Sequence, residues 1–230
     1  MLILSRKDLE ALAVQILRDA LPFPLDNGTR CIPIEQLARY YLGLETRYEK
    51  LCDWGELIGL TTFAGIMLKL RRNLREETIT VEADTILLDE SLNPPEMKPR
   101  RRFTVAHECA HQILSRYEEA IMGHSRRSKF QLGQTYSCRE LSNKSDWEEW
   151  QANVLASVLL MPKTVVEYVL ELCGVTEVFH LNGNKPGDFD EWSKYMKAAK
   201  TLGVSKQALA IRLWQLGYAE QQQMQYMKCG

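Results

Sequence analysis

The sequence has almost no net charge, no long apolar run and no cysteine pair at metal-binding spacing. It holds 29 Lys and Arg against 30 Asp and Glu, and this balance argues against bulk attraction to nucleic acid or to anionic lipid. No segment reaches the roughly 18 uninterrupted apolar residues of a membrane span. The six cysteines lack a CxxC pair and regular spacing, so we expect reduced thiols, mainly buried, and no disulfide framework.

The N-terminal segment also lacks the features of a secretory signal. It is charged from Arg6 onward and has no apolar core followed by a small-residue cleavage site. Between Leu9 and Leu21 its apolar residues recur at helical spacing, which predicts an amphipathic helix instead. We therefore expect a cytoplasmic protein without a membrane segment.

The apolar pattern that is present predicts a mixed α+β protein. Of the 230 residues, 45% are apolar, enough for a sizeable core. The predicted elements are a helix from Ile34 that Gly43 ends, one or two strands between Leu57 and Leu70, strands around Ile79–Val81 and Ile86–Leu88, a helix over Arg101–Leu114, a helix that Ser145 caps with Glu148 as its capping-box partner, and a helix after Pro162. The stretch 116–144 is polar without a period and is interpreted as a long loop.

Two last helical stretches, Asp190–Leu202 and Ser205–Leu216, are joined by "GVSKQAL", which has the Gly turn and Ser cap of a helix-turn-helix. The second stretch is largely apolar, and Lys206 and Arg212 supply too little positive charge for strong phosphate contacts. We therefore predict a packing or substrate-docking module without strong direct nucleic-acid binding. The chain divides into residues 1–175 and a C-terminal helical region, residues 176–230, that packs on them.

The most informative motif is His107-Glu108-Cys109-Ala110-His111, within "RRFTVAHECAHQIL". On a helix, side chains four residues apart lie about 40° apart around the axis, so both imidazoles can take one metal ion. Glu108 lies beside that pair, where a carboxylate can accept a proton from a metal-activated water. Cys109 projects to the opposite side and is interpreted as core packing. The alternative is a helix with two chance histidines, because HExxH alone is a short pattern.

A third ligand should come from another element, and "EEWQANVLASVLLMP" offers two carboxylates. Glu149 shares a helical face with Ala152 and Asn153, and the small alanine permits close approach of another helix. Glu148 lies on a different stripe and suits the capping role. Asn153, one turn after Glu149, could orient a ligand. The alternative for Glu149 is a solvated helix charge.

Three segments in this order, "RFTVAHECAH", "EWQANVLASVLLMP" and "GVSKQALAIRLWQLGY", resemble the zinc peptidases of the ImmA/IrrE family over roughly residues 79–218. The resemblance implies that His107, His111 and Glu149 are Zn²⁺ ligands and that Glu108 is the catalytic base. It also implies a zincin-like fold, mostly helical with a small sheet beside the HExxH helix. The implied activity is cleavage of a helix-turn-helix transcriptional repressor of a mobile element or a stress response.

This mechanism also requires a group that stabilises the oxyanion. His124 and Tyr136, in the polar stretch, are candidates, and an ordinary loop role is the alternative for each. Cys138 is interpreted as an incidental thiol rather than a metal-capping group. We expect the substrate to lie in an extended form along an edge of the strands between Leu57 and Leu88. Cleavage should then occur at one or a few positions of a partner transcription factor.

Two other classes of function stay open. One is a non-enzymatic regulator, in which the C-terminal pair binds DNA and the zinc site is structural. Glu108 argues against it, because a purely structural site does not need the glutamate. The other is a toxin–antitoxin component that uses the same fold as a binding scaffold.

Overall fold

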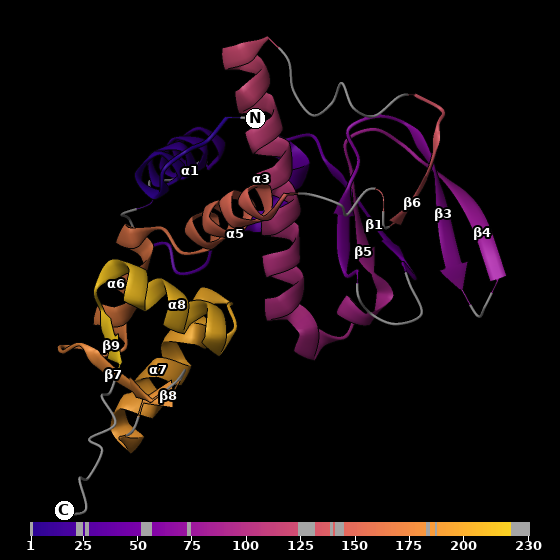
Figure 1. Ribbon diagram of the computed structural model, residues 1–230. Helices are drawn as coiled ribbons and strands as arrows, with labels where there is room; N and C mark the ends of the chain where they lie inside the picture. The colour runs from indigo at the N-terminus through magenta and orange to yellow at the C-terminus, as the bar shows by residue number, and fades with distance from the viewer. Residues whose placement is uncertain are drawn as a thin grey trace, which may run out of the picture.

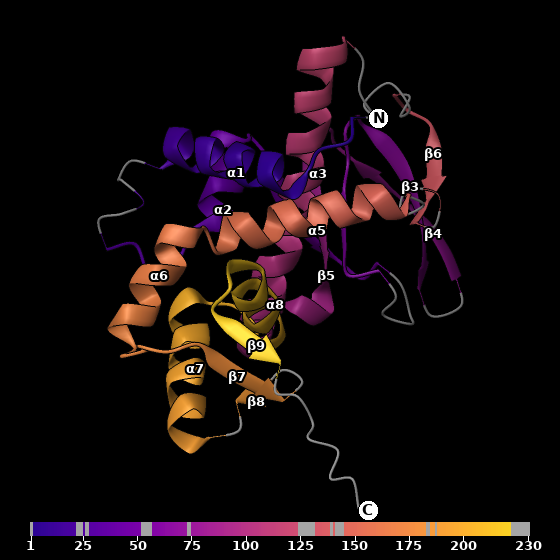
Figure 2. The ribbon, with the colours of Figure 1, turned by 60° about the vertical axis from the view of Figure 1, so that its left-hand side comes forward.

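The protein is described by a computed structural model that covers residues 2–21, 25, 28–51, 57–72, 75–123, 132–138, 140, 145–182, 185–186 and 188–221. One long helix, α3 (Lys98–Met122), stands between two parts of the molecule (Figure 1). Strands β1 to β6 lie on one side of it, and α1, α6, α7 and α8 lie on the other (Figure 1). Helix α5 (Asp146–Leu160) crosses α3, as both Figure 1 and Figure 2 show.

The other helical elements flank these two. In chain order they are α1 (Arg6–Ala20), α2 (Ile34–Gln36) continued by the π-helix η1 (Leu37–Tyr41), the 3₁₀ turns η2 (Glu90–Leu92) and η3 (Pro95–Met97), α6 (Lys163–Leu172), α7 (Phe189–Leu202) and α8 (Lys206–Leu216). Ser5 and Ser145 each form a capping box, with Asp8 and Glu148 respectively, so local hydrogen bonds fix where α1 and α5 begin.

The strands form three sheets of three strands each within the described residues. The first has the order β1 (Glu45–Glu49), β5 (Thr85–Asp89), β2 (Gly59–Thr61); the second β4 (Arg75–Val81), β3 (Ile66–Arg72), β6 (Thr135–Ser137); the third β8 (Lys185–Pro186), β7 (Phe179–Asn182), β9 (Ala219–Gln221). In the first sheet β5 pairs with β1 in parallel and with β2 antiparallel, which leaves β2 at an edge.

These elements confirm the predicted α+β class and most of the predicted helices. They contradict two other predictions. The long loop does not begin at Arg116, because α3 continues to Met122 and ends at Gly123, whose left-handed φ of 70° suits a helix C-cap. In place of the single small sheet that was predicted, the described residues form three sheets. Strands β1, β6, β7, β8 and β9 escaped prediction because they are only two to five residues long, too short for a clear periodic pattern.

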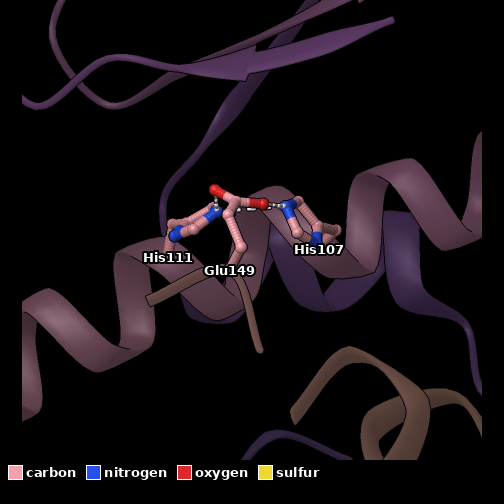
Figure 3. A group of neighbouring side chains, drawn as sticks. All are labelled: His107, His111 and Glu149. Atoms are coloured by element: carbon pink, nitrogen blue, oxygen red, sulfur yellow. Dashed lines mark hydrogen bonds and ion pairs between the residues drawn. The ribbon is translucent and has the colours of Figure 1, made fainter. Parts of the chain in front are cut away.

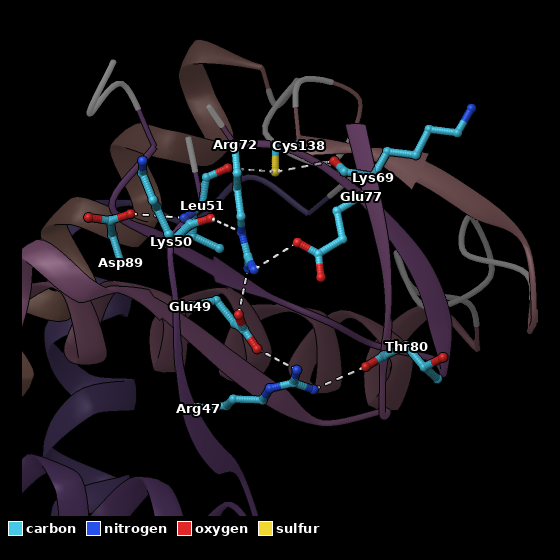
Figure 4. Close-up of polar contacts among 10 residues, drawn as sticks. All are labelled: Arg47, Glu49, Lys50, Leu51, Lys69, Arg72, Glu77, Thr80, Asp89 and Cys138. Carbon is cyan, nitrogen blue, oxygen red and sulfur yellow. Dashed lines mark hydrogen bonds and ion pairs between the residues drawn. The ribbon is translucent and has the colours of Figure 1, made fainter. Parts of the chain in front are cut away.

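Polar contacts tie the first two sheets together (Figure 4). Arg72, at the end of β3, donates from Nε to the backbone carbonyl of Lys50 at 2.9 Å and forms an ion pair with Glu49 of β1 at 2.5 Å. Arg47 of β1 donates to the backbone carbonyl of Thr80 on β4 at 3.1 Å. Because these bonds cross from one sheet to the other, the two sheets are held as one unit on their side of α3.

Two buried arginines attach the C-terminal helices to the rest of the protein. Arg102 of α3 donates to the backbone carbonyl of Gly203, between α7 and α8, at 3.1 Å, and to that of Ile32 at 2.6 Å. Arg212 of α8 donates to the carbonyl of Met161 at 2.9 Å and to the carboxylate of Glu10 at 2.7 Å. Charge-assisted hydrogen bonds of this kind are about twice as strong as neutral ones, so the C-terminal pair is fixed in place.

The same apolar core runs through both parts of the chain. Cys109 is fully buried in it, as predicted, and burial raises the pKa of its thiol far above the ordinary value. Cys173 is buried as well, whereas Cys31 is exposed; Cys52 and Cys229 lie outside the described residues. The predicted division between residues 175 and 176 stays a prediction.

Within the described chain, no helix on its own has the length and apolarity to cross a membrane, and only α5 and α6 together, bent by 46°, meet that test.

Candidate metal centre

Helix α3 presents His107 and His111 on one face, four residues apart. The helix is stable at this point because its other side is buried: Val105, Ala106, Cys109 and Ala110 have no exposed surface. The side chain of His111 is 2% exposed and that of His107 is 15% exposed. The two imidazoles therefore lie at the wall of the core and open toward one side only.

Helix α5 brings Glu149 to the same point (Figure 3). Its carboxylate reaches both histidines: Oε2 lies 3.1 Å from Nε2 of His107, and Oε1 lies 3.3 Å from Nε2 of His111. The crossing of α3 and α5 can be this close because Ala152, on the Glu149 face of α5, is small and fully buried. The neighbouring Glu148 is occupied in the capping box with Ser145, as the sequence predicted.

The three donor atoms fit a single metal ion. The Nε2 atoms of His107 and His111 are 3.0 Å apart, and all the donors lie within 4.8 Å of one another. Two donors that each lie about 2.0–2.1 Å from a tetrahedral zinc ion are about 3.3 Å apart. The separations of 3.0, 3.1 and 3.3 Å match that spacing, and two imidazoles with one carboxylate are ligands that zinc prefers.

Asn153 contacts one of these donor residues. Its Oδ1 lies 3.1 Å from Nδ1 of His107, one turn along α5 from Glu149. When Nδ1 carries the proton and donates it to Asn153, Nε2 of His107 presents its lone pair to the other two donors. Electron-rich atoms at these distances repel one another unless a cation or a proton lies between them. The arrangement therefore favours a bound cation.

Glu108 is buried beside the three donors. Its side chain is 3% exposed, and Oε2 has no hydrogen-bond partner among the described residues. A buried carboxylate oxygen without a partner is costly, by about 1–3 kcal/mol or more. Glu108 lines a cleft with His107, Glu149, Asn153 and residues 57–60. The Glu108 side chain is therefore part of the wall of this cleft, next to the three donors.

Gly59 allows β2 to approach the centre. A Cβ atom at this position would lie 2.3 Å from the methyl group of Thr104 and 3.2 Å from Oε1 of Glu108. Gln112 of α3 donates to the hydroxyl of Thr61 at 2.8 Å and to the carbonyl of Thr62 at 2.9 Å, so β2 is fixed along α3. The sequence analysis did not single out Gly59, although an isolated glycine in an apolar strand often marks a close approach.

The edge of β2 that faces away from β5 is open within the described part of the chain. The pairing Leu60↔Leu87, together with the bonds Thr62 N to Thr85 O and Asp89 N to Ile58 O, shows that residues 58, 60 and 62 hydrogen-bond to β5. Because backbone groups alternate along an antiparallel strand, those of Gly59 and Thr61 face the other way. They are available to an added strand.

The weaker candidates are not brought to this centre. Tyr136 pairs with Leu68 in the second sheet and is not among the described residues that line the cleft. Cys138 lies near the carbonyl oxygens of Leu51 and Lys69, at 3.7 and 3.9 Å (Figure 4). His124 lies outside the described residues. Tyr136 is therefore not placed to stabilise an oxyanion at this centre.

Comparison with known proteins identifies the family. Residues 55–214 match the Peptidase_M78 family, described as the IrrE N-terminal-like domain. The match covers more than half of the chain and includes α3, α5 and both C-terminal helices. No curated protein matches the sequence.

Proposed function

This chain belongs to the Peptidase_M78 family, the IrrE N-terminal-like peptidases, and from that premise we propose that it is a zinc-dependent endopeptidase with a zincin-like active site. One observation carries the proposal. The donors of His107, His111 and Glu149 converge at metal-ligand spacing, and beside them lies Glu108, a buried carboxylate whose Oε2 has no partner among the described residues. A structural metal site has no use for that fourth group.

His107, His111 and Glu149 would hold the zinc ion, and Asn153 would keep His107 in the tautomer that binds it. When bound, zinc acts as a Lewis acid that polarises a peptide carbonyl and makes water more acidic. Because three protein ligands leave a tetrahedral ion with one open position, the donor set suits a catalytic site.

Glu108 would act as the general base. Its carboxylate belongs to a residue that lines the same cleft as His107 and Glu149, so it can take a proton from water there and later deliver it to the leaving amide nitrogen. Gly59 keeps the carboxylate of Glu108 in place without a clash, because a side chain at residue 59 would press on Oε1.

The substrate would lie in an extended form against β2. The backbone groups of Gly59 and Thr61 face away from β5 and can pair with an added strand. A folded protein would have to present a linker or a locally unfolded segment to reach them. For this reason, and because of the family, we propose that the substrate is a regulatory protein, a helix-turn-helix transcriptional repressor.

Direct binding of DNA is not part of this proposal. Arg212, one of the two cations predicted to be available on α8, is fully buried and bonded to Met161 and Glu10. Phosphate contacts need exposed cations. Tight, salt-sensitive binding of the purified protein to duplex DNA would contradict this part of the proposal.

The decisive experiment compares the zinc-loaded protein with Glu108→Gln on two substrates, casein and a helix-turn-helix repressor from the same genome. We expect the native protein to cut the repressor at one or a few bonds and to leave casein largely intact. Glu108→Gln should retain zinc and lose activity by about 10²–10⁴-fold, the usual contribution of a general base. Undiminished turnover by Glu108→Gln would refute the mechanism, and broad digestion of casein with an intact repressor would refute the substrate class.

A further inference from the structure

A second groove opens beside the metal cleft, where α3, α5 and α8 meet. It has a volume of about 510 Å³, within the range of about 300–1,000 Å³ that ligand sites occupy. Phe103 and Asn153 line both this groove and the metal cleft. A molecule bound across the metal centre can therefore continue into the groove. Figure 2 shows α8 lying close below α5 and in front of the lower part of α3.

The walls of the groove are largely apolar. Phe103 of α3, Trp150 and Val154 of α5, and Ala208 and Ile211 of α8 line it. Ile211 is 41% exposed, so much of its side chain is open to a molecule that binds in the groove. Trp150 is held by stacking on Trp147, with ring centroids 4.5 Å apart. The groove is thus preformed and lined by side chains that favour an apolar ligand.

The charge of the residues that line the groove disfavours a positively charged ligand. Arg6 is the only charged residue among the described residues that line the groove; the others are polar and neutral, such as Ser205 and Gln215, or apolar. A lysine or arginine side chain would meet a like charge at Arg6 and no carboxylate. An aliphatic or aromatic side chain would bury its surface against Phe103 and Ile211.

The direction of β2 determines which part of a bound peptide substrate reaches the groove. Gly59 lies against Thr104 and Glu108, and Thr61 lies against Gln112, so β2 runs along α3 toward its C-terminus. A peptide added antiparallel to β2 runs the opposite way, toward Phe103. Its residues after the cleaved bond therefore reach the groove. Antiparallel pairing is the slightly more stable arrangement per residue.

We propose that this groove binds an apolar side chain of the polypeptide substrate on the C-terminal side of the cleaved bond, and that Ala208 and Ile211 of α8 determine this preference. The inference rests on the proposed function, since it assigns a subsite to the same centre. It also gives α8 a role in substrate selection in addition to its role in packing.

The first test measures binding without cleavage. The zinc-loaded Glu108→Gln protein is titrated with two blocked hexapeptides of alanine that carry either one leucine or one lysine. Methyl NMR follows Ala208 and Ile211. We expect the leucine peptide to shift both methyl signals and to bind at least tenfold more tightly than the lysine peptide. Ala208→Trp, which fills the groove, should remove that difference. Equal binding of both peptides, or unmoved methyl signals, would overturn the proposal.

The second test reads specificity from the native protein acting on a pool of random decapeptides. We expect Leu, Ile, Met and Phe to be enriched in the first two positions after the cleaved bond. Ile211→Glu should lose the enrichment and raise KM at least fivefold with little change in kcat. Met196→Glu is the matched control, because Met196 is a similarly exposed apolar residue of α7, 37% exposed, outside the groove.

The outcomes separate the two proposals. Cleavage without a downstream apolar preference would refute the subsite and leave the peptidase assignment intact. Binding of the leucine peptide with no cleavage of any peptide would refute the peptidase assignment and support the groove as a peptide-binding site.

Discussion

Two buried charged residues, Glu108 at the metal centre and Arg212 in the C-terminal pair, show how differently the two regions use a buried charge. Arg212 has no exposed surface; its Nε donates to the backbone carbonyl of Met161 and its Nη1 to the carboxylate of Glu10, while its Nη2 has no partner among the described residues. Glu108 is 3% exposed, and its Oε2 has no partner among the described residues. Burial is almost equal for the two side chains, but their surroundings are not.

The difference separates structure from chemistry. A buried charge that is hydrogen-bonded on several sides fixes the position of an element, and Arg212 fixes α8 against α1 and the end of α5. A buried carboxylate oxygen that is left unsatisfied destabilises the fold, and such groups cluster at functional sites. We therefore expect changes near Arg212 to affect the free energy of unfolding, and changes near Glu108 to affect metal binding and turnover.

The largest effect should come from the third ligand. Glu149→Ala removes the carboxylate that lies 3.1 and 3.3 Å from the two histidines. Zinc sites in proteins bind with roughly 10–16 kcal/mol shared among their ligands, so the affinity should fall on the order of a thousandfold. Competition with a chelator measures it. Glu148→Ala is the control and should keep its zinc affinity within a few fold; the reverse result would contradict the assignment of Glu149.

A large loss of stability should follow Arg212→Met. The change keeps much of the side chain's volume but leaves the carbonyl of Met161 without its donor and Glu10 without its ion pair. Breaking a buried charged contact from one side costs about 3 kcal/mol or more, measurable by urea unfolding. Zinc affinity in the folded protein should not change. Lys206→Met removes an exposed cation of the same helix, and comparable destabilisation by it would mean that net charge, not the buried contact, is responsible.

A smaller and more selective effect is expected for Asn153→Ala. Asn153 is exposed, so stability should change little, but His107 loses the acceptor at 3.1 Å that fixes its tautomer. Loss of such a partner lowers metal affinity by about 10–100-fold. Asn153→Asp keeps an acceptor and should retain most of the affinity. If both variants bound zinc as the native protein does, Asn153 would have no orienting role.

The smallest effect is expected when the same change, loss of the N-cap serine, is made in α5 at the metal centre and in α8 of the C-terminal pair. Ser145→Ala and Ser205→Ala each remove a hydroxyl that accepts from a backbone N–H at the start of a helix, α5 or α8. Each should lower the free energy of unfolding by about 1 kcal/mol. Only Ser145→Ala should also weaken zinc binding, by a few fold, because Glu149 lies in the first turn of α5. Equal zinc affinity in the two variants would show that the position of Glu149 does not depend on this cap.

Features that depend on neighbours along one helix could be predicted from the amino-acid sequence. His107 and His111 share a face because four residues make slightly more than one turn. In the structure their Nε2 atoms are 3.0 Å apart. The capping box of Ser145 and Glu148 follows from a spacing of three residues, and it also told Glu148 from Glu149. The same periodicity identified Asn153 as a partner, and the three segments in order identified the family.

Features that depend on residues far apart in the chain could not be predicted, because they follow from how the helices and strands pack. Strands β1, β6, β7 and β9 pair with partners far away in the sequence, so their own short sequences carry little signal. Gly59 meets Glu108, and α8 meets Phe103, across 49 and about 105 residues of chain respectively. From the sequence of α8 alone, Arg212 would be expected at the surface. It is buried because α1 and the end of α5 contact it. Local spacing fixes which side chains share a face, and only packing fixes what that face meets.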